Sequence, residues 1–198
     1  MEGREQVYRP EDLIAIINRH RHDWMNDLQV LIGYVQMNRQ DKIREYIARL
    51  SDKLTRESLV SKLADPNLVA YLHRFRAVCD WVGLEVAPEG EIDLTKLGPA
   101  GRRAAGWIPA VLEAFAESAI REEAEANRLT VAIGLDGRRL AVRFTFTGRC
   151  RMAQLHAALN PLLDSMRAEG AEVSLREEGG AADVLFRIAT ESAGTKGA

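Results

Sequence analysis

Two long amphipathic segments fill the first third of the chain, and they constrain the fold more than any other feature. Residues 13–37 contain no proline, and their apolar residues recur at steps of three, four and seven. Such spacing lines one face of an α-helix. Pro10, Glu11 and Asp12 come just before, a composition typical of a first helical turn. The apolar positions of this predicted helix are Leu13, Ile17, Trp24, Leu28, Leu31 and Val35.

The second segment follows residues 38–41, which break the pattern, and it predicts a helix over about 42–63. Two helices joined by a short loop form a hairpin, and a lone hairpin leaves apolar surface exposed. Pairing with a second copy closes a four-helix bundle, so we predict a homodimer. The alternative is that the stripes pack on the C-terminal half of the same chain. The second stripe comprises Ile43, Tyr46, Ile47, Leu50, Leu54 and Val60 or Leu63.

Helices and short strands alternate in the rest of the chain. Pro66 ends the second helix, and Asn67 is placed to cap the next one. Asp136-Gly137 lies between two alternating segments and is a strong signal for a β-hairpin. The predicted helices cover residues 68–82, 104–126 and 151–168, and 98–101 is a predicted loop. The predicted strands cover residues 84–86, 92–94, 129–135, 140–147, 173–175 and 184–188.

This order of elements predicts an α+β fold, with a helical hairpin followed by an α/β sandwich whose helices cover one face of a mixed sheet. Pro109 is expected in the first turn of its helix or at a kink. We expect a dimerisation hairpin over residues 1–64, an α/β domain over 65–191, and a disordered tail over 192–198.

Composition excludes several classes of function. The net charge is −2, so no basic excess favours a nucleic-acid partner. Cys79 and Cys150 lie far apart and read as small buried groups, not as a disulfide or a metal site. No apolar run is long enough to span a membrane, and residues 1–9 are too polar for a signal peptide. We therefore expect a cytoplasmic protein with no membrane or nucleic-acid partner.

His22 is the strongest candidate for chemistry. At about 100° per residue, it points away from the apolar stripe of its helix and into solvent. The face around it carries amides and a glycine instead of the usual lysine and glutamate mixture. The residues within about 40° of His22 on this face are Asn18, Asn26, Gln29, Gly33 and Gln36. The alternative is that His22 is an ordinary surface histidine and Gly33 a tolerated defect, which costs about 1 kcal/mol relative to alanine.

An exposed imidazole has a definite chemistry. Neutral imidazole is a nucleophile near pH 7 and attacks a phosphoryl group that is positioned in line. Asp23 follows His22 and is placed to orient the ring or to stabilise its protonated form. His20 and His22 diverge by about 200° on a helix, so they do not share a metal ion. We predict no metal site, and no nucleophile-elbow motif supports a serine hydrolase.

Residues 22–26 read His-Asp-Trp-Met-Asn, with Leu28 and Gln29 following. This segment resembles the phosphoacceptor segment of the sporulation initiation phosphotransferase B family, and it is similar to that of histidine kinases of the citrate/malate-sensing type. Residues 65–68 through 83–86 resemble the start of the ATPase-like domain of those proteins. The resemblance covers nearly the whole chain and implies a four-helix-bundle dimer with an ATPase-like α/β domain.

The resemblance also shows where an ATP site is missing. Ala114 and Ser118 stand where such kinases carry the asparagine that helps to hold magnesium. Residues 146–148 replace the expected Asp-Asn-Gly, and residues 149–152 lead straight into a helix without a glycine-rich lid. A magnesium–triphosphate site needs oxygen ligands and phosphate-binding amides. We therefore expect a degenerate domain, no cofactor bound by this chain, and Mg²⁺ on the partner proteins.

The resemblance implies a phosphotransferase in sporulation initiation. A phospho-aspartyl single-domain response regulator gives its phosphoryl group to His22, which passes it to the aspartate of a second, DNA-binding regulator. Asp23 and Asn26 support His22. The residues expected to contact the regulators are Asn18, Arg19, Gln29 and Gly33. Two alternatives stay open: an ATP-dependent sensor histidine autokinase, and a non-catalytic dimeric scaffold that binds a response regulator.

Overall fold

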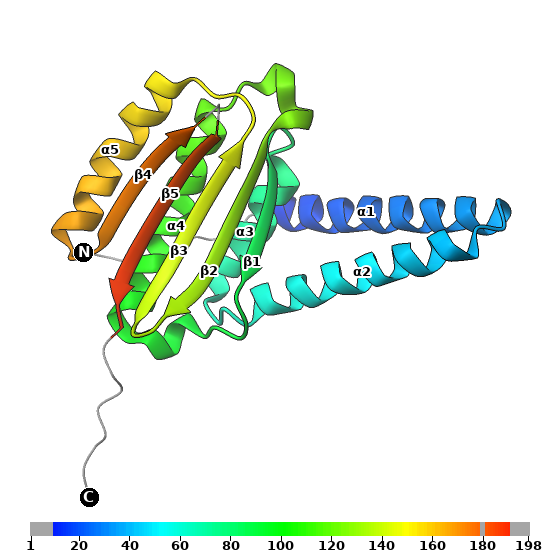
Figure 1. Cartoon of the computed structure of the whole chain (residues 1–198), viewed down its shortest axis with the longest axis horizontal. Helices are drawn as coiled ribbons and strands as arrows, with labels where there is room; N and C mark the ends of the chain where they lie inside the picture. Colours follow the sequence, from blue (N-terminus) through cyan, green and yellow to red (C-terminus); the bar gives the residue numbers. More distant parts are fainter. Residues whose placement is uncertain (1–9, 179–180, 191–198) are drawn as a thin grey trace, which may run out of the picture.

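A two-helix arm projects from a body of sheet and helices (Figure 1). The computed structural model describes residues 10–178 and 181–190. The arm is made of α1 (Pro10–Gln36) and α2 (Gln40–Ser61), as the two amphipathic segments predict. The expected tail over 192–198 and the segment 1–9 lie outside the described residues. None of the helices within the described ranges is long and apolar enough to cross a membrane.

Polar contacts hold the two helices of the arm together. The Tyr46 hydroxyl donates a hydrogen bond to Asp27 Oδ1 at 2.7 Å, and Lys53 Nζ lies 3.4 Å from Asp27 Oδ2. The Tyr46 ring also meets the edge of Tyr34, with centroids 6.1 Å apart. Asn38, with φ at 51°, makes the left-handed step that reverses the chain between the helices. The side of α1 that faces α2 is therefore polar and aromatic.

The end of α2 is built into the core of the body. Val60 and Leu63 are fully buried, and the Leu94 amide donates to the Leu63 carbonyl at 3.0 Å. Ala64 then turns the chain at φ 59° into α3 (Pro66–Val78). The arm is therefore fixed to the body at the C-terminal end of α2.

The cap of α3 differs from the expected one. Asp65, and not Asn67, is the N-cap residue: its carboxylate accepts a hydrogen bond from the Leu68 amide at 2.9 Å. Pro66 takes the first helical position, which needs no amide donor, and this moves the cap to the residue before it. The helix ends at Val78, four residues before the predicted Val82, because Cys79 has extended backbone angles.

The body contains one five-stranded mixed sheet in the order β1-β2-β3-β5-β4. β1 pairs parallel with β2, and the remaining pairs are antiparallel. The hairpin between β2 and β3 is confirmed, with Gly137 at φ 60° in its turn. The strands are β1 (Gly83–Pro88), β2 (Arg128–Asp136), β3 (Arg139–Thr147), β4 (Glu172–Glu178) and β5 (Ala181–Ala189).

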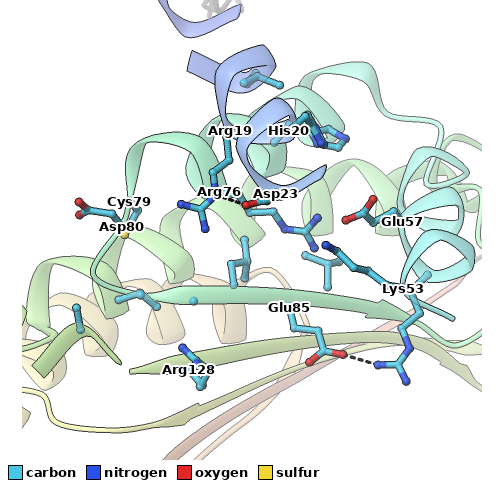
Figure 2. Close-up of a pocket in the computed structure, with 18 of the residues that line it drawn as sticks. Arg19, His20, Asp23, Lys53, Glu57, Arg76, Cys79, Asp80, Glu85 and Arg128 are labelled. Carbon is cyan, nitrogen blue, oxygen red and sulfur yellow. Dashed lines mark hydrogen bonds and ion pairs between the residues drawn. The ribbon is translucent and has the colours of Figure 1, made fainter. Parts of the chain in front are cut away.

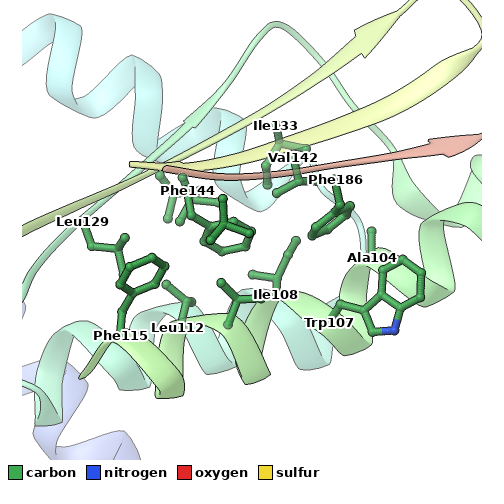
Figure 3. Close-up of a cluster of buried hydrophobic side chains, with 14 of the residues drawn as sticks. Ala104, Trp107, Ile108, Leu112, Phe115, Leu129, Ile133, Val142, Phe144 and Phe186 are labelled. Atoms are coloured by element: carbon green, nitrogen blue, oxygen red, sulfur yellow. The ribbon is translucent and has the colours of Figure 1, made fainter. Parts of the chain in front are cut away.

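Helices α3, α4 (Gly98–Ser118) and α5 (Met152–Ala168) cover one face of this sheet (Figure 1). Between α4 and the sheet lies an aromatic core (Figure 3). Phe115 stacks on Phe146 with centroids 5.5 Å apart, and Trp107 meets Phe186 edge-on at 5.5 Å. The α+β class predicted from the sequence is thus confirmed.

Two predicted elements of this region are wrong. Residues 92–94 do not form a strand, because Asp93 caps a short 3₁₀ helix, η1 (Leu94–Leu97), by accepting from the Thr95 amide at 3.0 Å. The predicted loop 98–101 is the first turn of α4, which therefore starts six residues early and ends at Ser118. A β-carbon on Gly101 would lie 1.9 Å from the Leu94 carbonyl oxygen, so glycine is required there.

The remaining differences also concern α4. Residues expected at its C-terminal end form a separate 3₁₀ helix, η2 (Arg121–Ala126), because Ala119 is extended and pairs with Cys150 in a β-bridge. Pro109 lies in the interior of α4 and not in its first turn, since the helix begins eleven residues earlier.

The N-cap at Asp65 gives a stability prediction. Asp65→Ala removes the acceptor for the Leu68 amide and is expected to lower the free energy of unfolding by about 1 kcal/mol. Asp65→Asn keeps a capping oxygen and should remain near wild type. Urea denaturation followed by circular dichroism measures both, and equal losses in the two variants would contradict the capping role.

Candidate functional site

His22 lies near the middle of α1, and its side chain is 67% exposed. The structure places it on the outer side of the arm, as the helical period predicts. Residues that contact α2 and α3 lie about 80–160° around the helix from His22. These inward residues are Asp12, His20, Asp27 and Tyr34. The imidazole is thus open to a partner protein.

Two neighbours on the same helix contact the imidazole. The Asn26 amide nitrogen lies 3.2 Å from His22 Nδ1, and Asp23 Oδ1 lies 3.5 Å from the same nitrogen. Asp23 Oδ1 is also 3.4 Å from Arg19 Nε. All four side chains come from one face of α1 within two turns, so a helix alone is enough to assemble them.

The Asn26 contact bears on which imidazole nitrogen is nucleophilic. An amide side chain presents either its nitrogen or its oxygen after a half-turn, and an imidazole changes tautomer to match. As the structure places it, the amide nitrogen donates to Nδ1 and the neutral ring carries its proton on Nε2. With the amide turned so that its oxygen faces Nδ1, the proton lies on Nδ1 and the Nε2 lone pair is free. A fixed ring with one free lone pair is suited to in-line attack on a phosphoryl group.

The remaining predicted site residues line the same face of α1. Asn18, Arg19 and Gln29 are exposed. A β-carbon on Gly33 would meet no atom of the described residues within 4 Å. The packing of this chain therefore gives no reason for glycine at position 33, and the two interpretations made from the sequence remain: close approach of a partner, or a tolerated defect.

A third side of α1 is apolar and uncovered. Apart from Leu31, which is partly buried, its large side chains are more than half exposed, whereas the polar side of the helix faces α2 and α3. The alternative that the C-terminal half covers this stripe is therefore wrong for α1; on α2 it holds for Val60 and Leu63, which are buried in the body. The large apolar residues that are more than half exposed on the two helices are Leu13, Ile14, Ile17, Trp24, Met25, Leu28, Ile32 and Val35 on α1, and Ile47 and Leu54 on α2.

A cleft of about 940 Å³ separates the arm from the body (Figure 2). His20 of α1 and His73 of α3 meet there, with ring centroids 5.6 Å apart. Burial lowers the pKa of His73, and the positive charge of Arg76 adds to this effect. Within the described part of the chain, Arg76 Nε has no hydrogen-bond partner. Arg19 and Asp23 line the cleft as well as the surroundings of His22.

The sequence reasoning missed this cleft. His20 and His73 are 53 positions apart, and no local spacing connects them. Only the packing of α1 on α3, fixed by an ion pair between Asp12 and Arg74 at 2.9 Å, brings the two imidazoles together. The ion pair between Arg56 of α2 and Glu85 of β1 closes the opposite side of the cleft.

The positions where kinases hold magnesium and nucleotide lie inside the body. Ser118 is fully buried and donates its hydroxyl hydrogen bond to the Ala114 carbonyl at 2.7 Å. Phe146 is fully buried against Phe115. Gly148, at φ 135°, packs on Asn127, whose amide bonds to backbone groups of three segments. These side chains are packed into the core of the body.

Comparisons with known proteins agree with this picture. Residues 2–63 match the family described as the α-helical domain of SpoOB-type sensor kinases. Sporulation initiation phosphotransferase B of Bacillus subtilis (strain 168) is 30% identical over 139 residues, which cover 69% of this chain and 70% of the relative.

Solved histidine kinases are more distant. The kinase AdeS of Acinetobacter baumannii is 12% identical, with 86% of this chain and 98% of that chain covered and a TM-score of 0.44. A histidine kinase of Burkholderia phymatum STM815 is also 12% identical, with coverages of 91% and 94% and a TM-score of 0.41.

The chain's helical arm, which matches the SpoOB-type sensor-kinase family and is joined to an α/β body, places the protein in the two-component phosphotransfer class. Within that class, the identity to the Bacillus protein and the match of the arm to the SpoOB-type model are decisive: the chain belongs to the sporulation initiation phosphotransferase B family. It is a phosphotransferase that acts in a phosphorelay. The resemblance inferred from residues 22–29 is thereby confirmed.

The half-buried His73 gives a pH prediction. Its pKa is lower in the folded chain than in the unfolded chain, so the unfolded chain binds more protons just below pH 6.5. The free energy of unfolding should therefore fall as pH drops through this range. His73→Gln should make that fall smaller, as measured by urea denaturation at a series of pH values. An unchanged pH dependence in the variant would contradict the assignment.

Proposed function

We propose that His22 is the phosphoryl-carrying residue of this phosphotransferase. The observation that carries the proposal is the exposed imidazole on the projecting arm, which Asn26 contacts at Nδ1. A phosphohistidine made by protein-to-protein transfer has to be reached by two partners in turn, and an exposed position on a projecting arm permits this.

The transfer proceeds by two displacements at phosphorus. The Nε2 lone pair of neutral His22 attacks the phosphorus of a regulator's aspartyl phosphate; the N–P bond forms, and the O–P bond breaks with its electron pair going to the aspartate. In the second step an aspartate of another regulator attacks the phosphohistidine, and the N–P bond breaks to return neutral imidazole. Mg²⁺ bound by the regulators offsets the phosphoryl charge, and this chain supplies no cofactor.

Partner contacts follow from the face around His22. Asn18, Arg19, Gln29 and Gly33 lie on the same side of α1 and form the surface on which a response regulator docks. The missing β-carbon at Gly33 lets a partner's backbone come close to the helix, and amides give hydrogen bonds without charge repulsion. The donor is a single-domain regulator and the acceptor a DNA-binding regulator of sporulation initiation, so the protein works in the cytoplasm.

A second copy of the chain covers the apolar stripe of the arm. Both α1 and α2 carry exposed apolar side chains, and two such arms bury them in a four-helix bundle. His22 lies outside the stripe, so it remains exposed in the dimer.

The dimer is tested by a charge in the stripe. Leu28→Glu places a carboxylate in the apolar interface and is expected to give monomers, because burying an unpaired charge is costly. Gln29→Glu, one residue along and outside the stripe, should stay dimeric. Light scattering after size-exclusion chromatography measures both masses. A monomeric wild type, or a dimeric Leu28→Glu variant, would overturn this interface.

The role of His22 is tested by transfer. Wild type incubated with a ³²P-labelled single-domain response regulator should acquire label that is labile in acid and stable in base. His22→Gln should acquire none, whereas His20→Gln, which changes a histidine facing α3, should still be labelled. Labelling of His22→Gln at the wild-type rate would show that the proposal is wrong.

The same assay separates the two alternatives. An autokinase predicts label on the chain from ATP and Mg²⁺ with no regulator present, but the buried Ser118 and Phe146 favour no such labelling. A non-catalytic scaffold predicts that wild type binds the regulator without acquiring label and that His22→Ala leaves binding and biological output intact.

A further inference from the structure

Asp23 lies between the His22 imidazole and the Arg19 guanidinium, and its charge also interacts with Arg76 of α3. The proposed chemistry needs the imidazole to be neutral. The Asp23 Oδ1 atom lies 3.5 Å from His22 Nδ1 and 3.4 Å from Arg19 Nε. A carboxylate beside an imidazole stabilises the protonated form of that ring. Protonated imidazole has no free lone pair and does not attack phosphorus. Asp23 therefore makes the His22 imidazole less nucleophilic unless another cationic side chain pairs with the Asp23 carboxylate.

Arg19 is placed to engage that charge. It precedes Asp23 by four residues, the spacing at which side chains on a helix meet. Guanidinium stays protonated throughout the physiological range, so it pairs with the carboxylate whether or not His22 is charged. About half of the Arg19 side chain and a third of the Asp23 side chain are exposed, so the pair is a solvent-screened one of modest strength.

Asn26 completes the arrangement from the other side. Its amide contacts His22 Nδ1 at 3.2 Å and carries no charge. The ring is thus oriented by a neutral group, while the neighbouring carboxylate is partly neutralised by a guanidinium.

We propose that Arg19 is a positioning residue that acts through Asp23: by pairing with the Asp23 carboxylate, it keeps the His22 imidazole neutral and nucleophilic. This inference rests on the proposed role of His22 in phosphotransfer. It assigns Arg19 a task in the free protein, in addition to any contact that it makes with a docked regulator.

The test follows the His22 ring C–H resonances by NMR over pH 5–9 in the free full-length protein. Arg19→Gln should raise the titration midpoint of His22 by roughly 0.2–0.4 pH unit, the size expected for a helical i, i+4 charge pair. Arg19→Lys keeps the positive charge, so its His22 midpoint should differ from that of wild type by no more than about a third of the Arg19→Gln shift. Assignment of the His22 signals comes from their loss in His22→Gln.

A double-mutant cycle distinguishes action through Asp23 from simple proximity of charge. In an Asp23→Asn background, Arg19→Gln should leave the His22 midpoint unchanged. If Arg19→Gln causes the same shift in both backgrounds, or no shift in wild-type background, the proposal is overturned. Because no regulator is present, loss of a docking contact cannot produce the expected result.

Transfer kinetics supply the functional half of the test. For a model imidazole, whose pKa is about 6.5, a rise of this size lowers the neutral fraction roughly 1.5- to 2-fold at pH 6 and hardly at all at pH 8.5. At saturating regulator, Arg19→Gln should lose this additional factor in transfer rate at pH 6 relative to its own rate at pH 8.5, whereas wild type should not. A pH-independent loss would mark Arg19 as a docking residue only. If His22→Gln still acquires label from the regulator, the proposed function is refuted. The NMR double-mutant cycle would still report whether Arg19 acts on His22 through Asp23.

Discussion

The rotation of α1 about its own axis is the constraint on which the rest of the site depends. Asp27 accepts hydrogen bonds from Tyr46 and Lys53 of α2, and about four turns away Asp12 pairs with Arg74 of α3. These contacts turn the polar side of the helix inward. The helical period then places His22 on the outer side and leaves the apolar residues on a third side. A helix with its polar side packed inward and its apolar side exposed is unfavourable in a monomer, and the proposed dimer would remove that cost.

Much of this arrangement was predictable because it is local. The hairpin, the β2–β3 turn and the exposed position of His22 each follow from residues within a few turns or one loop of one another. The cleft was not, because His20 and His73 meet only after α1 packs on α3. The strand predicted at 92–94 failed for a similar reason: the Leu94 amide bonds to Leu63, and Gly101 must pass close to the Leu94 carbonyl. Those contacts join residues that are distant in the sequence, and the spacing of apolar residues within one segment cannot predict them.

The α/β body anchors the arm. Val60 and Leu63, at the end of α2, are buried among its residues, and Arg56 pairs with Glu85 on β1. Ser118 stands where the related kinases are expected to carry the asparagine that helps to hold magnesium. Its hydroxyl instead donates a hydrogen bond to the Ala114 carbonyl of the same helix, α4. This packing is consistent with membership of the phosphotransferase family. The body anchors the arm, and the phosphoryl group that the proposed function places on the arm comes from a partner protein. The arm's residues Arg19, Asp23, His22 and Asn26 need only the helix itself to meet.

Direct mapping of the phosphoryl group tests the central claim. The chain would be incubated with a phosphorylated single-domain regulator, digested at neutral to basic pH, and sequenced by tandem mass spectrometry with electron-transfer fragmentation, which preserves the labile N–P bond. The account predicts a single phosphorylated residue, His22. A phosphoryl group on His20, His73, His156 or an aspartate of this chain, or none on the chain while the regulator loses its own, would contradict it.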